Sequence, residues 1–263
     1  MPRPLSKIHR IARGVASALA IVGFAISAHA ADPAPATTPK SAFTPAQREE
    51  LKHIMHDYIV ANPEVINEAV VALQAKEDAA RQEKQKATIA TRKQELFNPA
   101  EGTVMGNPQG DVTIVEFFDY NCGYCKSMFP AMIETLKEDG KVRLVMKEFP
   151  ILAPSSITAS KAALAAVKQN KYADLNIAML SHKGALSDQT VMELAKGAGL
   201  DVSRLQADMK APDLDKVIAR NTDLASALDV TGTPTLIIGK TITAGSLSKD
   251  KLKELIAAAR AKS

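Results

Sequence analysis

The sequence of 263 residues has few of the residues that stabilise small exported domains. It contains two cysteines, no tryptophan and 4 % aromatic residues. Two cysteines are too few for the disulfide framework of a small secreted domain. With 46 % hydrophobic residues, a chain of this length can bury a substantial core without disulfide bonds. The two cysteines therefore need an explanation other than a structural framework.

The sequence also lacks an apolar run long enough to cross a membrane. The run Gly14–Ile26 has about 13 residues, whereas a bilayer core needs about 20. It follows the basic residues Arg3, Lys7, Arg10 and Arg13 and precedes the small residues Ala28 and Ala30, an order typical of a signal peptide. We expect residues 1–30 to be a signal peptide cleaved after Ala30 and the mature chain to be soluble and exported. An uncleaved amphipathic anchor is the alternative.

Excess positive charge is missing from the mature chain. The formal net charge of +4 is matched by the four basic residues of the signal segment, which contains no acidic residue. Nucleic-acid-binding domains usually carry a clear basic excess. We therefore expect no nucleic-acid partner. The sequence also contains no internal repeat and no Gly-rich phosphate-binding loop.

The N-terminal region has a composition of its own. Residues 31–43 are rich in Pro, Ala and Thr, which predicts a flexible leader. Thr44-Pro45-Ala46-Gln47 is a capping box with Pro at the first helical position, and it predicts a helix to about Ala61. A second helix should follow Asn62-Pro63, with a polar continuation to Lys93 and one apolar face, formed by Val65, Ile66, Ala69, Val70 and Leu73.

The apolar face of these two helices needs a surface to cover it. We expect residues 44–97 to form a helical domain and linker helix. The chain should assemble into a homo-oligomer, a dimer or a trimer, through residues 44–75, with the polar stretch 76–97 as a spacer. In the alternative, the helices pack back on the globular body of their own chain.

Residues 98–263 predict one α/β domain. A β-branched and aromatic run, 112–118, predicts a buried strand that leads into the cysteines and then into a helix to about Asp139. The rest of the domain should comprise a second strand at 141–149, a helical block at about 154–228, a hairpin from 233–239 and 241–245, and a capped C-terminal helix.

Both cysteines lie in the stretch DYNCGYCK, as Cys122 and Cys125. Residues three apart on a helix share a face, so their Cα atoms lie near the roughly 5–6 Å that a disulfide prefers. Cys122 should lie at the positive end of the helix, where the helix dipole and free N–H groups favour a thiolate. We therefore expect Cys122 to be the nucleophile and Cys125 to resolve the mixed disulfide.

Other functions of the two cysteines are open at this stage. A structural disulfide would close too short a loop to stabilise the chain much. A zinc site would need further ligands, and His53, His56 and His182 do not have a finger-like spacing to the cysteines. Cu(I) is a stronger alternative, because two thiolates alone can bind it.

The stretches VEFFDYNCGYCK and TGTPTLIIG, in this order behind an export signal, resemble the thioredoxin-fold Dsb oxidoreductases of the bacterial periplasm. The helical block 154–228 resembles the helical insertion of the DsbA branch, and NPEVINEAV resembles the N-terminal domain of the suppressor of copper sensitivity C (ScsC) proteins. The resemblance implies an α/β thioredoxin fold with a helical insertion, preceded by an N-terminal α-helical oligomerisation element.

The resemblance also assigns roles to residues. Cys122 matches the attacking cysteine and Cys125 the resolving one, while Thr233-Pro234 matches the loop whose proline is cis and lies against the active site. Glu116 matches the buried acid that accepts a proton from the resolving thiol, although a merely structural polar residue is the alternative. Gly123-Tyr124, with Thr before the proline, resembles the isomerase DsbC more than the oxidase DsbA.

These matches imply a periplasmic thiol-disulfide oxidoreductase, in particular a disulfide isomerase or reductase without a cofactor other than its redox-active disulfide. Its implied partners are misfolded or disulfide-containing periplasmic proteins and a membrane thiol reductase of the DsbD or ScsB type. A DsbA-type dithiol oxidase is one alternative. A copper-binding or copper-tolerance protein with Cu(I) at Cys122 and Cys125 is the other.

Overall fold

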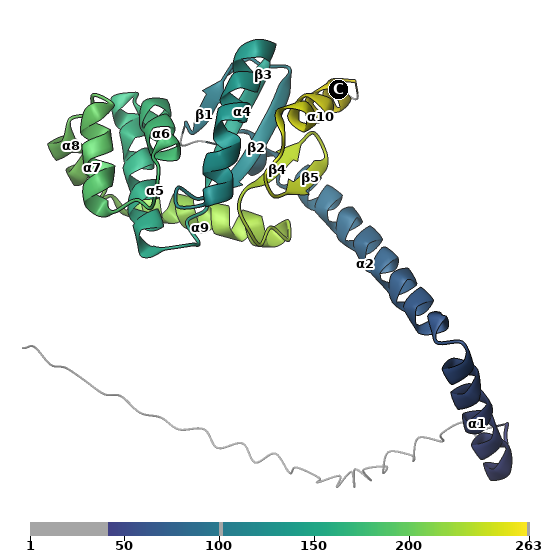
Figure 1. Ribbon diagram of the computed structural model, residues 1–263. Helices are drawn as coiled ribbons and strands as arrows, with labels where there is room; N and C mark the ends of the chain where they lie inside the picture. The colour runs from purple at the N-terminus through teal and green to yellow at the C-terminus, as the bar shows by residue number, and fades with distance from the viewer. Residues whose placement is uncertain (1–41, 100–101, 262–263) are drawn as a thin grey trace, which may run out of the picture. The chain divides into compact units, whose positions relative to one another are not determined.

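The computed structural model describes residues 42–99 and 102–261 (Figure 1). The predicted signal peptide, most of the predicted leader and the cleavage site lie outside these residues. Within the described ranges, no helix is both long and apolar enough to cross a membrane. The chain divides into two units, Met1–Pro63 and Glu64–Ser263.

The described part of the first unit is the helix α1 (Pro45–Ala61), which begins with the predicted capping box. The Gln47 N–H donates to Thr44 Oγ1 at 3.3 Å, and the Thr44 N–H donates to Gln47 Oε1 at 2.9 Å. No residue of α1 is buried. Its large apolar side chains are exposed, namely Leu51, Ile54, Met55, Tyr58, Ile59 and Val60.

The second unit begins with α2 (Glu64–Thr91), a single helix that includes the predicted polar continuation. Its first turns expose apolar side chains, including Ile66, Val70 and Leu73. Its last turns pack on the domain that follows, where Gln85 donates to the Leu228 carbonyl at 2.8 Å and Ile89 is buried. The short helix α3 (Lys93–Phe97) adds the fully buried Leu96 to the same core. The predicted linker is therefore, from about Lys84 onward, part of the globular body.

The body is built on a five-stranded sheet of order β1-β3-β2-β4-β5. The central strand β2 (Val112–Phe118) is parallel to β3 (Val142–Glu148), whereas the other pairs are antiparallel. The strands β4 (Thr235–Ile238) and β5 (Thr241–Ala244) pair as the predicted hairpin. The edge strand β1 (Val104–Gly106) was not predicted, because three residues are too few to show a pattern.

Helices cover both faces of the sheet. The helix after the cysteines, α4 (Gly123–Asp139), and the C-terminal helix α10 (Lys249–Arg260) share one core with Ile114 and Phe118 of β2. The other face carries Val115 and Phe117 against α3 and α9. Between β3 and β4 the predicted helical block forms five helices and a 3-10 turn: α5 (Pro154–Ala166), η1 (Val167–Gln169), α6 (Tyr172–Ser181), α7 (Asp188–Gly197), α8 (Val202–Asp208) and α9 (Pro212–Ala227).

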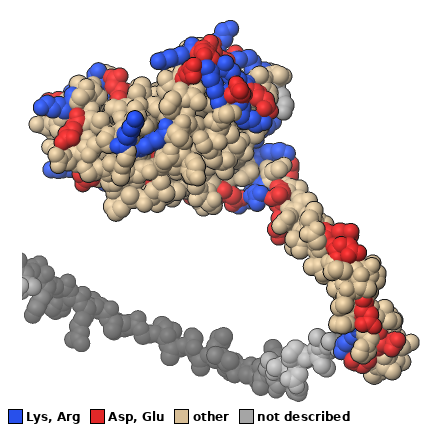
Figure 2. All heavy atoms as spheres, in the orientation of Figure 1, with Lys and Arg blue, Asp and Glu red and all other residues tan. Residues whose placement is uncertain are grey.

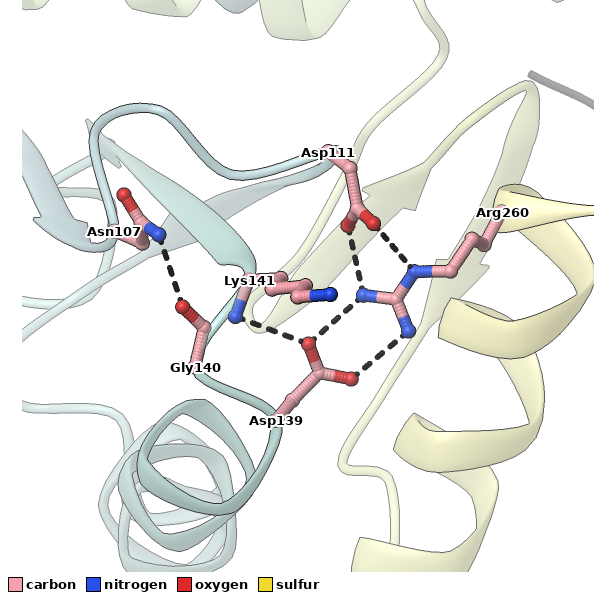
Figure 3. Close-up of polar contacts among 6 residues, drawn as sticks. All are labelled: Asn107, Asp111, Asp139, Gly140, Lys141 and Arg260. Atoms are coloured by element: carbon pink, nitrogen blue, oxygen red, sulfur yellow. Dashed lines mark hydrogen bonds and ion pairs between the residues drawn. The ribbon is translucent and has the colours of Figure 1, made fainter.

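One arginine ties α10 to the sheet and to the far end of α4 (Figure 3). Arg260 donates two hydrogen bonds to the Asp111 carboxylate, at 2.7 and 2.9 Å, and two to that of Asp139, at 2.8 and 3.0 Å. The hydrogen bonds from Arg260 lower the pKa of both carboxyl groups. Because Asp111 precedes β2 and Asp139 ends α4, this cluster fixes the end of α4 that is opposite to the cysteines.

Candidate active site

The cysteines lie where the central strand β2 turns into α4. Cys122 has extended backbone angles and is the N-cap of α4, and its Sγ accepts the N–H of Cys125 at 3.4 Å. The turn before it is closed by the Cys122 N–H, which donates to the Asp119 carbonyl at 3.0 Å. The Cys122 sulfur therefore lies at the helix N-terminus, as predicted, where the free N–H groups stabilise a negative charge.

The two thiols have unequal surroundings. Both are free. Cys122 is 4 % exposed and its Sγ lies 3.2 Å from the carbonyl oxygen of Thr233, whereas Cys125 is 1 % exposed. Burial raises the pKa of the Cys125 thiol well above its ordinary value, and the negative charge of Glu116 raises it further. Cys125 is thus the shielded thiol of the pair, in the position expected for a resolving cysteine.

The Thr233–Pro234 peptide bond is cis, and it brings Thr233 against Cys122. The contact is made by the Thr233 main-chain carbonyl. The Thr233 hydroxyl is buried and has no hydrogen-bond partner among the described residues. The oxygen that accepts the hydrogen bond from the Cys122 thiol therefore belongs to the backbone of Thr233 and not to its side chain.

Glu116 lies in the middle of β2 and is 1 % exposed. Burial raises its pKa to about 8, and its Oε2 atom has no hydrogen-bond partner among the described residues. A carboxyl group with such a pKa exchanges its proton near neutral pH. The negative charge of Glu116 raises the pKa of the Cys125 thiol, as expected of an acid close to the shielded thiol.

Asp119 is a part of the site that the sequence reasoning missed. Its buried carboxylate accepts four hydrogen bonds, two at each oxygen. Oδ1 accepts from the Asn121 N–H and the Ser156 hydroxyl, both at 2.7 Å, and Oδ2 accepts from the N–H groups of Ile151 and Leu152, at 2.9 and 3.0 Å. The position of Asp119 directly after a buried strand was the available signal.

Asn121 and Lys126 extend these links around the cysteines. The Asn121 amide donates to the hydroxyls of Ser155 and Ser156, at 3.1 and 3.0 Å, and its oxygen accepts the Leu186 N–H at 2.8 Å. Lys126, in the first turn of α4, donates to the carbonyls that precede α7, including that of His182 at 3.0 Å. The helical insertion therefore holds the cysteine turn in place.

A third buried carboxyl, Glu148, lies at the end of β3, and the sequence reasoning missed it as well. Its Oε1 accepts the hydroxyls of Tyr120 and Tyr172, each at 3.0 Å, and Asn176 donates to the Tyr120 oxygen at 3.0 Å. Burial raises the pKa of Glu148 to about 8. Because Tyr120 lies in the cysteine turn and Tyr172 in α6, this cluster is another link between the turn and the insertion.

The histidines considered for zinc lie apart in the chain from the cysteines. His53 and His56 are exposed on α1, and His182 follows α6. Among the residues that the structure describes, no group of three or more His, Cys, Asp or Glu side chains could hold a metal ion. A site made by the two thiols alone is a different case, and it stays a proposal.

Fold, thiol pair and cis-proline loop together define the class of thioredoxin-fold thiol-disulfide oxidoreductases of the Dsb and ScsC type. Residues 98–258 match the family described as thioredoxin, and the chain belongs to this family. Residues 47–80 match a second family, the N-terminal domain of the copper resistance protein ScsC.

Two solved structures of thioredoxin-like and ScsC proteins are similar to this chain. A thioredoxin-like oxidoreductase from Silicibacter pomeroyi is 39 % identical, with a TM-score of 0.62 over 64 % of this chain and 97 % of its own. A linker-deletion variant of Proteus mirabilis ScsC is 26 % identical, with a TM-score of 0.65 over 85 % of this chain and 100 % of its own.

A curated relative is a much longer protein. The Na(+)/H(+) antiporter NhaA 3 of Salinispora tropica is 29 % identical over 143 residues, which are 54 % of this chain. The chain spans only 22 % of the length of that antiporter.

Proposed function

We propose that this protein catalyses thiol-disulfide exchange on other proteins and that its main activity is disulfide isomerisation. The observation that carries the proposal is the asymmetry of the thiols. Cys122 caps α4 beside the Thr233 carbonyl, and Cys125 is buried behind it near Glu116. A pair built in this way can attack with one sulfur and keep the other in reserve.

The reaction starts at the Cys122 thiolate, which attacks one sulfur of a substrate disulfide. The substrate S–S bond breaks, a mixed disulfide with Cys122 forms, and the second substrate sulfur leaves as a thiolate. If another substrate thiolate then attacks the mixed disulfide, Cys122 is regenerated and the substrate is isomerised without net electron transfer. If Cys125 attacks instead, the substrate is reduced by two electrons and the Cys122–Cys125 disulfide forms.

Glu116 is the proton acceptor in the second route. Cys125 must lose its proton to attack, and its burial makes this loss unfavourable without a nearby base. The Glu116 carboxylate takes this proton, and its pKa of about 8 makes it a stronger base than an ordinary carboxylate. The membrane thiol reductase that we expect as partner would then return both cysteines to the thiol form.

The test gives the mature protein a substrate protein with scrambled disulfides and measures how fast the native disulfides form. We expect Cys122→Ser to abolish exchange, and Cys125→Ser to attack but to accumulate mixed disulfides that mass spectrometry detects. Accumulation in the Cys122→Ser variant instead would reverse the two roles. A wild-type protein that leaves the scrambled substrate unchanged, but oxidises a reduced one, would favour the dithiol oxidase.

The expected setting of this activity is the periplasm, with a homo-oligomer assembled through the N-terminal helices. The match of residues 47–80 to the ScsC N-terminal domain and the exposed apolar side chains of α1 and α2 support the oligomer. N-terminal sequencing of the exported protein tests the expected cleavage after Ala30.

Binding of Cu(I) by Cys122 and Cys125 is the second candidate function. The two free thiols, one helical turn apart, favour it, since soft thiolates suit Cu(I). Titration of the reduced protein with Cu(I) against a competing chelator tests it. Loss of binding in Cys122→Ser and in Cys125→Ser is the expected result, and unchanged binding in both variants contradicts a site at the thiols.

A further inference from the structure

A groove of about 940 Å³ lies at the end of the sheet that is opposite to the cysteines. It is lined by Val112 and Thr113, the first residues of β2, whereas the cysteine turn follows the last residue of that strand. One wall comes from the end of α2 and from α3, and the other wall comes from α10. The groove is therefore separate from the thiol pair.

The buried part of the lining is apolar. Ile89 of α2 belongs to the core on one face of the sheet, while Val112 and Ile238 belong to the core on the other face. The half-buried side chains of Phe97 and Leu255 add apolar surface from the two walls. Sites for small molecules are typically concave and mostly apolar, with volumes of roughly 300–1,000 Å³. The groove has the size and the apolar interior of such a site.

The charged residues of the groove are mainly basic. Those with a positive charge are Lys86, Lys93, Arg143 and Lys240. Asp111 also lines the groove, but its carboxylate already accepts two hydrogen bonds from Arg260. Lys93 and Lys240 are exposed, and their side chains make no hydrogen bond or ion pair with the residues that the structure describes. Figure 2 shows Lys and Arg side chains, together with acidic ones, where α2 reaches the domain. The groove thus offers two ammonium groups to an anion.

We propose that this groove binds an anionic amphiphile, a single apolar chain that ends in a carboxylate. The chain lies against the apolar interior, where its burial is favourable, and the carboxylate pairs with the ammonium groups of Lys93 and Lys240. A peptide fits this interior less well, because its backbone N–H and C=O groups need hydrogen-bond partners that buried apolar side chains do not offer. The binding does not depend on the proposed exchange activity.

The experiment titrates the mature protein with three probes in a calorimeter. Dodecanoate has the proposed chain and carboxylate, butyrate has the carboxylate on a short chain, and dodecyltrimethylammonium has the same chain with a positive head. We expect dodecanoate, below the concentration at which it forms micelles, to bind at least about tenfold more tightly than either of the others. Equal binding of either one, or no binding of dodecanoate, would overturn the proposal. Tighter binding of a peptide rich in Leu and Glu would also overturn it and assign the groove to a protein partner.

Two substitutions on α10 test the place of binding. Ala258 is exposed and lines the groove, so Ala258→Phe places a ring in it and should raise the Kd of dodecanoate by more than about tenfold. Its neighbour Ala257 is also exposed but does not line the groove, and Ala257→Phe is the matched control. An unchanged Kd in Ala258→Phe, or an equal loss in both variants, contradicts the proposed site.

Two lysines test the charge. Lys93→Gln with Lys240→Gln should raise the Kd of dodecanoate about tenfold, because it removes both ammonium groups that attract the carboxylate. Lys196→Gln with Lys210→Gln, at two exposed lysines outside the groove, is the control. The melting temperature without ligand and the rate of disulfide exchange should stay at the wild-type values in all these variants. If Ala258→Phe fails to fold, the lysine variant carries the test, and a Kd equal to that of its control overturns the proposal.

Discussion

At the scale of single residues, the site is a set of buried groups whose charge depends on their neighbours. Cys125 and Glu116 are both buried, and the negative charge of Glu116 raises the pKa of the Cys125 thiol beyond the effect of burial. In such a pair only one group is readily ionised, and a carboxylate that takes up the proton of the thiol also removes its own negative charge from beside the new thiolate. For this reason we expect Glu116 to affect the second step of the proposed reaction and not the first.

The first prediction follows for Glu116→Gln. We expect this variant to form the mixed disulfide at the wild-type rate and to slow its resolution by Cys125. The difference in resolution rate between wild type and variant should grow as the pH rises from about 6 to 8. The reason is that the wild-type carboxyl, with a pKa of about 8, becomes ionised over this range and can then accept the proton of Cys125. Quenched-flow trapping of the mixed disulfide measures the effect. A deficit that is the same at every pH would mean that Glu116 is only a structural residue.

The second prediction concerns stability, for which Glu116 and Glu148 act alike. Burial raises both pKa values from the ordinary 4.5 to about 8. Between about pH 4.5 and 8 the folded protein keeps protons that the unfolded chain has lost, so the free energy of unfolding falls as the pH rises through this window. We expect Glu116→Gln to flatten this fall in thermal melts. Asp201→Asn, an exposed cap of α8, is the control that should leave the pH dependence unchanged.

At the scale of elements, the strand β2, the cysteine turn and α5 are joined through Asp119. An ionised carboxylate suits four donors, because it has lone pairs and no proton of its own. Removing it leaves buried N–H and hydroxyl groups without partners, which costs about 1–3 kcal/mol for each group that water does not reach.

The third prediction is that Asp119→Ala lowers the melting temperature by several degrees and slows the alkylation of Cys122. The reasons are the unpaired donors and the loss of the contacts that hold the turn. Asp201→Ala is the matched control, because it also removes an aspartate that accepts a backbone N–H, but at an exposed position. Replacing a helix-capping residue of this kind by alanine typically lowers the free energy of unfolding by about 1 kcal/mol. Equal effects of both substitutions would contradict a special role of Asp119.

Sequence reasoning predicted the elements with strong patterns and missed contacts that depend on the tertiary fold. The run 112–118, the capping box at Thr44 and the hairpin near the C-terminus have local signals, and the structure contains all three. The cysteine spacing and the resemblance also indicated Cys122, Cys125 and the cis-proline loop. The roles of Asp119 and Glu148 could not be read in this way, because all their donors except the Asn121 N–H come from segments 24 to 37 residues away.

At the scale of the whole molecule, the question is how far the N-terminal helices act apart from the catalytic domain. The end of α2 and α3 cannot be removed without damage, because Ile89 and Leu96 belong to the domain core and Lys147 donates to the Glu95 carbonyl at 2.7 Å. The beginning of α2 contributes no buried residue before Ile89. A deletion that tests the oligomerisation element should therefore end near residue 80 and keep everything from Lys84 onward.

The last prediction concerns this deletion. An isomerase must hold a misfolded chain while its disulfides exchange, and several catalytic domains in one assembly do this better than a single domain. We expect the mature protein to be a dimer or trimer in light scattering at tens of micromolar, and the form without residues 31–80 to be a folded, redox-active monomer that has lost most isomerase activity. In the full chain, Val70→Asp with Leu73→Asp should dissociate the oligomer, because it places charge on exposed apolar positions of α2. Ala79→Asp with Ala80→Asp, on the polar part of the same helix, is the control. A mature protein that is already monomeric, with full isomerase activity, would show that the catalytic domain needs no partner copy.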